Sequence, residues 1–358
     1  MGNFAANKSI MDRAANLWSF PGDPAGYLKE LLNQRPATSL WLLCDRNTRK
    51  SCLPLIQSAL PSDCKIITVP AGEKSKSLES LAEILKKLSR GGADRHSLLL
   101  CLGGGMICDL GGLAATLFKR GMRFIFLPTS LLCMADACLG GKNGIDFEGF
   151  KNQIGTFSDP EEIILLPGFL DTLPRPELLS GMAEIMKHAL CSNPAVWNTL
   201  RRTELLQQNR QLLIEESLRF KQSVVEEDPL ERGRRKILNA GHTAGHALES
   251  FFLERGLQQP HGFCIAAGLI IEGRIAAEKG FLPEEELLQV EEFVYAEYGM
   301  LPFSRKDIPR IVSFCRQDKK NRNGSVRASL FGPIGQCHTD VEITAEEMQR
   351  GLRYYLGK

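Results

Sequence analysis

The sequence of 358 residues has no run of about eighteen consecutive apolar residues, so we expect no membrane-spanning helix. It also lacks a dense cluster of Lys and Arg, and its formal net charge is only +2, which argues against a nucleic-acid partner. The N-terminal stretch has no apolar core of the kind found in signal peptides. The composition, with 43% hydrophobic and 24% charged residues, is that of a globular protein, and together with these absences it indicates a cytoplasmic protein. The chain is long enough for two domains.

Paired cysteines of the redox or metal-binding kind are missing as well. The chain has eleven cysteines, an odd number, and no two of them form a Cys-x-x-Cys pair. Several lie in apolar or Gly-rich segments, among them Cys44, Cys101, Cys108 and Cys133. We therefore expect free, buried thiols in a reducing compartment rather than a disulfide framework.

Residues 1–175 alternate between apolar runs and helical patterns. The apolar runs that predict buried strands are SLWLLCD (39–45), KIITVPAG (65–72), SLLLCLGGG (97–105), RFIFLPT (123–129) and EIILLP (162–167). A helical repeat at 77–93 separates the second run from the third and ends at a Gly pair. Apolar strands that alternate with helices predict an α/β domain, with a parallel sheet covered on both faces.

Residues 176–358 have a different texture, because strand-like runs fade and helical periodicity dominates. The strongest helical patterns are ELLSGMAEIMKHAL (177–190), LLIEESLRFKQSVVEED (212–228), AAGLIIEGRIAAEKG (266–280) and PEEELLQVEEFVYAEYG (283–299). This half is therefore predicted to be a second, mainly α-helical domain.

Three segments of the first half carry glycine together with charged residues. The turn CLGGGMICDLGG (101–112) can bring backbone N–H groups to a phosphate, or it can be only a tight strand-to-helix turn. The segment AGEKSK (71–76) adds charge at another strand end, or it is a solvated loop. The stretch 136–155 carries Lys142 and Lys151 and suits a phosphorylated ligand, unless it is a plain surface loop.

The second half holds an unusual group of histidines for a chain that has only six. We predict RKILNAGHTAGHALES (235–250) as helix, and His242 and His246 then share one face and could hold a metal ion or be two satisfied helix histidines. A third histidine, His261, follows in the segment HGF. Glu184 lies three residues before Lys187, and the two side chains either belong to a functional site or form an ion pair on a helix surface. Three histidines and one carboxylate would suffice for a catalytic zinc site.

Taken in order, the motifs resemble those of the 3-dehydroquinate synthases. The resemblance rests on PAGEKSK, GGGMICDLGG, FKRG, LPTSLL, DACLGGKNGID, KNQIGTF, SGMAEIMKHA, EEDPLERGRRKILNAGHTAGHALE, HG and DKKNRNG. It implies an NAD-binding α/β domain with a Rossmann-like parallel sheet, a helical metal- and substrate-binding domain, and an active site in the cleft between them. It also implies a phosphate-eliminating lyase that turns 3-deoxy-D-arabino-heptulosonate 7-phosphate into 3-dehydroquinate in the shikimate pathway.

The resemblance further implies cofactors and residue roles. Members of the family require NAD and a divalent metal, zinc or alternatively cobalt. The resemblance implies that Glu184, His242 and His261 are the metal ligands. The catalytic or substrate positions are His246, Lys142, Lys187, Asn152, Lys221, Arg235, Asn239 and one of Lys319 and Lys320, of which we favour Lys320. Arg120 would reach the substrate phosphate of a partner subunit in a homodimer.

The positions that match coenzyme contacts gather in the first half. They are Asp45, Asn47, Glu73, Lys76, Gly104, Gly105, Asp109, Thr129, Ser130, Lys142, Lys151 and Thr172, with Asp136 matching a position that contacts coenzyme or substrate.

The sequence departs from the family pattern at a few places. Phe263 stands where a Glu normally follows His-Gly, and a carboxylate beside a ligating histidine is a plausible orienting group. Asn143 replaces a Thr, Ser130 replaces a second Thr, and Cys108 takes a position that is usually small. The alternatives that remain are a related sugar phosphate cyclase, a low-activity or non-catalytic paralogue, and a metal- and NAD-dependent alcohol dehydrogenase.

Overall fold

The computed structural model describes residues 17–148, 150–202, 209–315 and 326–357. The chain divides into two compact units, Met1–Leu173 and Pro174–Lys358. This division lies beside the boundary that the sequence places between residues 175 and 176. Each unit has its own buried apolar residues.

The first unit is built on a six-stranded sheet in the order β1-β8-β5-β4-β2-β3. Every strand pairing in it is parallel. The strands are β1 (Trp18–Ser19), β2 (Leu40–Asp45), β3 (Lys65–Val69), β4 (Leu98–Gly103), β5 (Arg123–Pro128) and β8 (Ile163–Ile164). The five predicted strands and the parallel sheet are confirmed, because continuous apolar runs suit strands buried on both faces.

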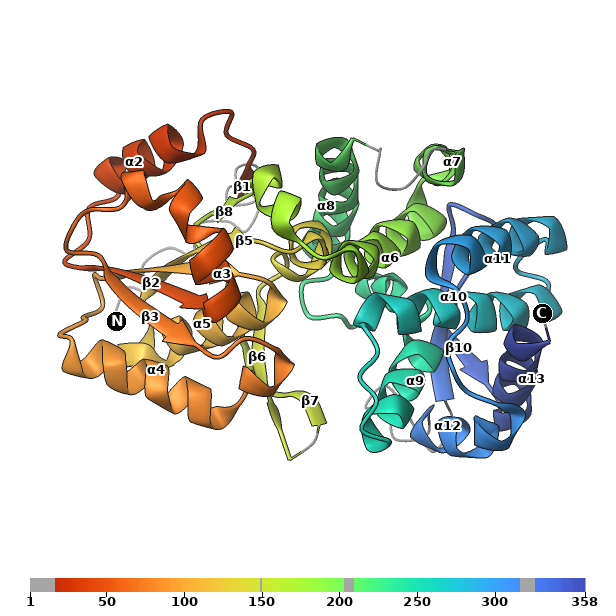
Figure 1. Ribbon diagram of the computed structural model, residues 1–358. Helices are drawn as coiled ribbons and strands as arrows, with labels where there is room; N and C mark the ends of the chain where they lie inside the picture. Colours follow the sequence, from red (N-terminus) through yellow and green to blue (C-terminus); the bar gives the residue numbers. More distant parts are fainter. Residues whose placement is uncertain (1–16, 149, 203–208, 316–325, 358) are drawn as a thin grey trace, which may run out of the picture. The chain divides into compact units, whose positions relative to one another are not determined.

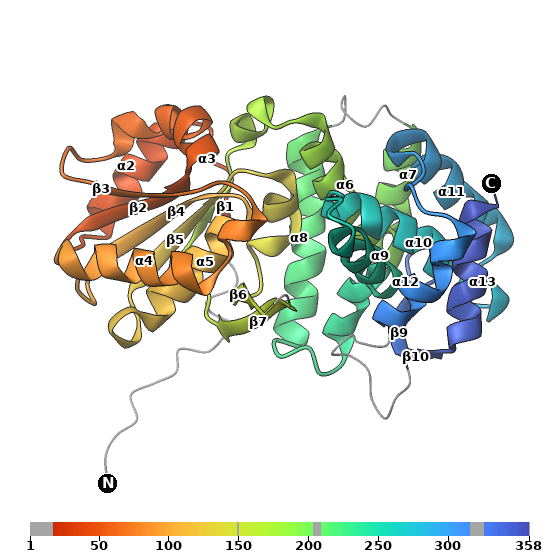
Figure 2. The ribbon, with the colours of Figure 1, turned by 60° about the horizontal axis from the view of Figure 1, so that its bottom comes forward.

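Helices cover both faces of this sheet, with α4 and α5 on one side and α2 and α3 on the other (Figures 1 and 2). The α-helices are α2 (Pro24–Gln34), α3 (Arg46–Ser51), α4 (Leu78–Arg90) and α5 (Gly105–Leu117). Short helical turns follow β3, β5 and β8, namely η3 (Glu73–Ser75), η5 (Cys133–Ala137) and η6 (Pro167–Thr172), and η4 (Phe118–Arg120) follows directly on α5. From β2 the chain moves to β3 on one side and later to β4 on the other, so the strand order reverses between β2 and β4. Ligands of open α/β sheets bind at such a reversal.

An antiparallel hairpin, absent from the sequence prediction, lies in the polar segment 136–155. It pairs β6 (Lys142–Phe147) with β7 (Phe150–Phe157). Gly144 and Gly155 oppose each other, and a Cβ on Gly155 would lie 2.4 Å from the Asn143 carbonyl oxygen. Glycine allows this close approach but also removes the β-branched signal from the sequence, which is why the hairpin was missed.

The second unit is mainly helical, as predicted. Its helices are α6 (Arg175–Ser192), α7 (Pro194–Arg202), α8 (Arg210–Glu227), η8 (Arg234–Asn239), α9 (His242–Glu254), α10 (His261–Glu278), α11 (Glu284–Tyr298), η9 (Arg305–Asp307), α12 (Ile308–Cys315) and α13 (Ala345–Leu356). Helix α10 is the centre of the unit, since it packs against α6, α9, α11 and α13. Its residues from Gly262 to Ile271 are almost all buried, which explains the weak amphipathic pattern of this segment.

The second unit also contains an antiparallel hairpin that is not predicted from the sequence. It pairs β9 (Val326–Phe331) with β10 (Cys337–Ile343). Strand β10 is only partly buried and its register shifts between His338 and Val341, so its sequence does not alternate cleanly. The prediction of a mainly helical domain holds, but it was incomplete.

All eleven cysteines lie in the described part of the chain, and none forms a disulfide. Nine are buried, in agreement with the expectation of free thiols in the core.

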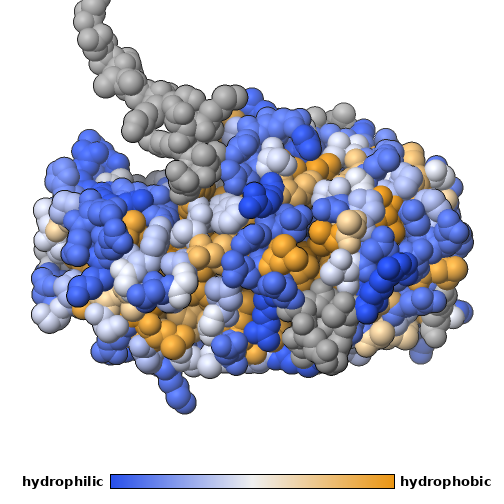
Figure 3. All heavy atoms as spheres, turned by 90° about the horizontal axis from the view of Figure 1, so that it is seen from above, coloured by the Kyte–Doolittle hydropathy of each residue, from blue (hydrophilic) through white to orange (hydrophobic). Residues whose placement is uncertain are grey.

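On the face drawn in Figure 3, small hydrophobic groups are interspersed among hydrophilic side chains. Among the described residues, no helix combines the length and the apolarity needed to cross a bilayer.

Candidate functional site

Helix α6 carries a buried ion pair. Glu184 and Lys187 are each only 1% exposed, and Lys187 Nζ donates to Glu184 Oε2. An i,i+3 pair on a helix surface would be solvated, so the surface alternative is wrong here. Burying two charges is costly, which makes this pair a candidate for function rather than for stability alone.

His242 is the first residue of α9 and faces this pair. Its Nδ1 lies 3.0 Å from the carbonyl oxygen of Ala240, which can only accept, so Nδ1 carries the proton. Its Nε2 lies 3.6 Å from Glu184 Oε1. The hydrogen bond thereby leaves Nε2 as the nitrogen available to a metal ion.

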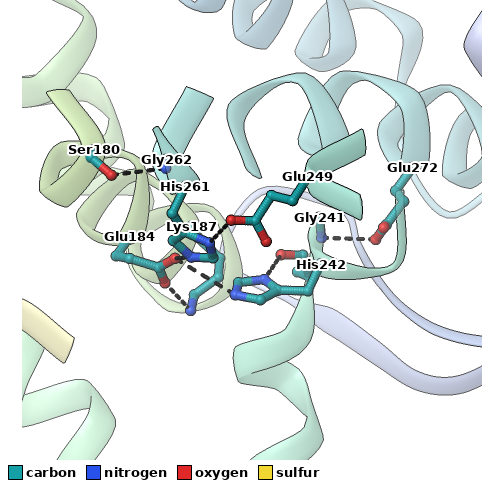
Figure 4. A network of polar contacts seen from close by, with 10 residues as sticks. Ser180, Glu184, Lys187, Gly241, His242, Glu249, His261, Gly262 and Glu272 are labelled. Carbon is teal, nitrogen blue, oxygen red and sulfur yellow. Dashed lines mark hydrogen bonds and ion pairs between the residues drawn. The ribbon is translucent and has the colours of Figure 1, made fainter. Parts of the chain in front are cut away.

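His261 is the first residue of α10 and reaches the same carboxylate (Figure 4). Its Nε2 lies 3.1 Å from Glu184 Oε1, and its Nδ1 lies 3.1 Å from Glu249 Oε1. Burial lowers the pKa of His261, but the charges of Glu249 and Glu184 outweigh this effect and raise the pKa to about 10. Without metal, His261 is therefore positively charged at neutral pH, with a proton on each ring nitrogen.

The donor set of Glu184, His242 and His261 fits a divalent metal ion. One ligand atom from each residue lies within 4.8 Å of the others. One carboxylate and two imidazoles suit zinc and cobalt, and three protein ligands leave a coordination position open.

His246 lies beside this group, with its ring centroid 5.1 Å from that of His242 and 6.1 Å from that of His261. A second group, His246, Glu249 and His261, also has its ligand atoms within 4.8 Å. A neutral imidazole offers only one unprotonated nitrogen, so His261 can serve one group at a time.

Close contacts at two glycines hold α6, α9 and α10 together. A Cβ on Gly262 would lie 2.3 Å from the Ser180 carbonyl oxygen, and a Cβ on Gly268 would lie 2.0 Å from the Gly241 carbonyl oxygen. The buried carboxylate of Glu272 accepts hydrogen bonds from the backbone N–H groups of Gly241 and Ala244, at 2.7 and 2.8 Å. These contacts fix the start of α9 and therefore the place of His242 (Figure 4).

The prediction of one helix through residues 235–250 is wrong in its first half. A 3₁₀ helix ends at Asn239, Gly241 adopts a left-handed φ of 75°, and α9 begins at His242. A Cβ on Gly241 would meet Leu269 at 2.8 Å, so contact with α10 requires glycine in this break. His242 and His246 thus share a face of α9, but Arg235 and Asn239 belong to the preceding 3₁₀ helix and not to this face.

Arg235 is only 2% exposed, and its Nη1 donates to the Pro229 carbonyl oxygen at 2.7 Å. Asn239 Nδ2 donates to Glu231 Oε1 at 2.6 Å, and Lys221 on α8 is also buried. Glu231 is not among the site residues predicted from the sequence, and only the fold brings it to Asn239. Lys319 and Lys320 lie outside the described residues.

In the first unit, several residues that match coenzyme positions lie at the carboxyl ends of strands. Asp45 ends β2, Gly104 and Gly105 follow β4, and Thr129 and Ser130 follow β5. The Asp45 carboxylate caps α3 by accepting from the N–H groups of Asn47 and Thr48. A Cβ on Gly104 would lie 3.0 Å from Ser130 Oγ, so glycine keeps this turn open beside the start of α5.

Lys76 is the centre of a polar cluster in this unit. Its Nζ lies 2.5 Å from Asp109 Oδ2 and 2.6 Å from Asn152 Oδ1. Burial lowers the pKa of Lys76, but Asp109 and Glu73 outweigh it and hold the pKa above its ordinary value. Lys76 is therefore a buried cation and not part of a solvated loop.

The remaining matched residues of the first unit are more accessible. Asp136 is half-buried in the π-helical turn η5. The exposed residues are Asn47, Glu73, Arg120, Lys142, Lys151, Asn152 and Thr172. Arg120 and Asn152 have left-handed φ values of 67° and 51°, which are rare outside glycine.

Two of the departures from the family pattern have structural explanations. Asn143 is buried, and its Nδ2 donates to the carbonyl oxygens of Gly141 and Ser158, so it anchors the β6–β7 hairpin. The ring of Phe263 packs edge-on against Tyr298 of α11, with centroids 5.3 Å apart.

Comparison with known proteins identifies the family of this chain. Residues 66–180 match the family model for the N-terminal part of 3-dehydroquinate synthase, and residues 181–321 match that for its C-terminal part. The chain is 37% identical over 333 residues to the 3-dehydroquinate synthase of Parabacteroides distasonis, covering 92% of this chain and 94% of the relative. The chain belongs to the 3-dehydroquinate synthase family.

Solved structures of two other synthases share the fold of this chain. A 2-epi-5-epi-valiolone synthase from Streptomyces hygroscopicus with NAD+ and Zn2+ matches with a TM-score of 0.83 and 23% identity, covering 96% of this chain and 97% of that one. A 2-deoxy-scyllo-inosose synthase with carbaglucose-6-phosphate, NAD+ and Co2+ matches with a TM-score of 0.81 and 20% identity, covering 94% and 96%.

Proposed function

We propose that this protein is a 3-dehydroquinate synthase, a phosphate-eliminating lyase of the shikimate pathway. Its substrate would be 3-deoxy-D-arabino-heptulosonate 7-phosphate, and its products 3-dehydroquinate and phosphate. The observation that carries the proposal is the donor set of Glu184, His242 and His261 beside the buried Lys187, in a chain of this family. The protein would act in the cytoplasm.

Glu184, His242 and His261 would hold the divalent metal, zinc or alternatively cobalt. When bound, the metal polarises the substrate hydroxyls as a Lewis acid. Lys187, buried against Glu184, places a fixed cation beside the ligand set. His246, on the same face of α9 as His242, is placed to accept or donate a proton through its imidazole.

The coenzyme would lie along the carboxyl edge of the sheet, where Gly104 and Gly105 admit a phosphate to the first turn of α5. When bound, the coenzyme would supply a reversible hydride acceptor, so no net NADH would accumulate. The other coenzyme contacts would be Asp45, Asn47, Glu73, Lys76, Asp109, Thr129, Ser130, Asp136, Lys142, Lys151 and Thr172.

Cationic and amide side chains would hold the substrate itself. Arg235 offers a planar guanidinium to the substrate carboxylate, which distinguishes an acid sugar from a neutral one. Lys142 and Asn152 would hold the phosphate that leaves, and Lys221, Asn239 and Lys320 would complete the contacts. Arg120, exposed on η4, would reach the phosphate bound by the partner subunit of a homodimer.

The direct test is to follow phosphate release from 3-deoxy-D-arabino-heptulosonate 7-phosphate, with metal-loaded protein and a trace of NAD+. We expect phosphate without accumulation of NADH, and loss of the activity when a chelator is added. Net NADH formation would indicate a dehydrogenase, and release from a neutral sugar phosphate alone would indicate a related cyclase. Either outcome contradicts the proposed function.

Metal binding should release a proton. Because the pKa of His261 is raised to about 10, both ring nitrogens of this imidazole are protonated at neutral pH in the metal-free protein, and the proton on Nε2 must be lost when the metal binds. Affinity for zinc should therefore rise with pH up to about 10 and weaken as the pH falls. Calorimetry in buffers of different ionisation enthalpy checks this, and a binding enthalpy that does not depend on the buffer would contradict it.

A further inference from the structure

His261 has a carboxylate at each of its two ring nitrogens. Glu184 Oε1 lies 3.1 Å from Nε2, and Glu249 Oε1 lies 3.1 Å from Nδ1 (Figure 4). Glu249 belongs to α9, seven residues after His242 and three after His246, so the three side chains share one helix face. Its side chain is 10% exposed, which places the contact largely out of water.

We propose that Glu249 is a positioning residue that orients His261 for metal binding. This inference rests on the proposed function only in that it takes Glu184, His242 and His261 as the metal ligands. A proton on Nδ1 that is donated to Glu249 leaves Nε2 free to bind the metal and makes the imidazole a stronger donor. The Ala240 carbonyl oxygen does the same for His242, so both ligating histidines have their tautomer fixed by an acceptor on Nδ1.

Charge supports the same role. The Glu184–Lys187 ion pair is neutral as a unit, so these two side chains do not compensate a divalent cation. Glu249 adds a negative charge one imidazole away from the metal position. Removing it would weaken both the orientation of His261 and the local attraction for the cation.

This arrangement also explains how the chain accommodates Phe263. The family pattern has a carboxylate there, but both ring nitrogens of His261 already have partners without it. Phe263 instead packs on Tyr298, whose Oη donates to the Leu179 carbonyl oxygen on α6. The orienting carboxylate for His261 thus comes from α9 and not from α10.

The test is the dissociation constant for Co2+, measured by competition with a chromophoric chelator and without substrate. We expect Glu249→Ala to weaken binding by about 10–100-fold and to alter the visible Co2+ spectrum. Glu249→Gln keeps an acceptor for Nδ1 but loses the charge, so its loss should be smaller and close to the lower end of that range. The matched control is Glu254→Gln on the same helix, an exposed residue paired with Arg310, which should bind like wild type.

Phe263→Glu, placed in the Glu249→Ala background, should not restore Co2+ binding. Restoration by Phe263→Glu, or Glu249 variants within about threefold of wild type, would overturn the inference. If Glu249→Ala does not fold, the Co2+ dissociation constant of the near-isosteric Glu249→Gln variant alone decides whether the inference holds. Because Co2+ binding needs no turnover, a protein whose Co2+ affinity depends on Glu249 but which releases no phosphate would refute the proposed function and leave this inference standing.

Discussion

Replacing His242 by alanine should abolish phosphate release, with a loss of at least about 100-fold, and should weaken metal binding. In the proposed site the imidazole would supply one of three ligands through Nε2, which lies 3.6 Å from Glu184 Oε1. Lewis-acid stabilisation by a bound metal is worth several kcal/mol, and about 3 kcal/mol corresponds to two powers of ten in rate. Phosphate release and the dissociation constant for zinc, measured on the same preparations, check this prediction.

The fold should survive this substitution. His242 is the first residue of α9, a position that tolerates alanine, and its ring nitrogens face the Ala240 carbonyl oxygen and Glu184 of the site itself. The matched control is His96→Ala, an exposed histidine of the first unit, which should retain full activity. If His242→Ala keeps more than half of the activity while the control behaves as wild type, His242 is not a metal ligand.

Gly262→Ala is expected to be among the most destabilising single-methyl additions in the second unit. The new Cβ would lie 2.3 Å from the Ser180 carbonyl oxygen and 2.4 Å from Ser180 Cα, both in the backbone of α6. A backbone cannot rotate away as a side chain can, so we expect a cost of about 3 kcal/mol. For a domain of this size, the melting temperature should fall by roughly 6–12 °C.

The same substitution should weaken metal binding, because α6 carries Glu184 and α10 begins at His261, next to the altered residue. Gly168→Ala is the matched control: its φ is not left-handed and no atom lies within 4 Å of the added Cβ. Its melting temperature should stay close to that of wild type. A Gly262→Ala protein that melts and binds zinc like wild type would show that α6 and α10 can separate without cost.

Much of the first unit could be predicted from the sequence because its signals are local. Fully apolar runs such as 39–45 and 97–105 have few solutions other than strands of a covered parallel sheet. Residues that follow such strands must gather at one edge of the sheet, whatever the details of packing. The hairpins β6–β7 and β9–β10 were missed because glycine and partial exposure leave no clear alternation in their sequences.

In the second unit, the sequence determined that long helices form and that Glu184, His242, His246 and His261 are candidates for one site. Spacing alone could not separate ligands from neighbours, since i and i+4 on one helix fit both roles. The break before His242 arose from contact between Gly241 and α10, a contact between residues far apart in the chain.

Only the tertiary structure could assign the supporting carboxylates. Glu249 ends the family motif GHTAGHALE, but the motif does not show what this carboxylate contacts, and Glu272 stands among helical glutamates, which normally lie in solvent. Their roles depend on how closely α9 and α10 pack, which brings Glu249 to His261 and Glu272 to the start of α9. Local sequence determined which side chains could act, and the distances between helices decided which of them meet.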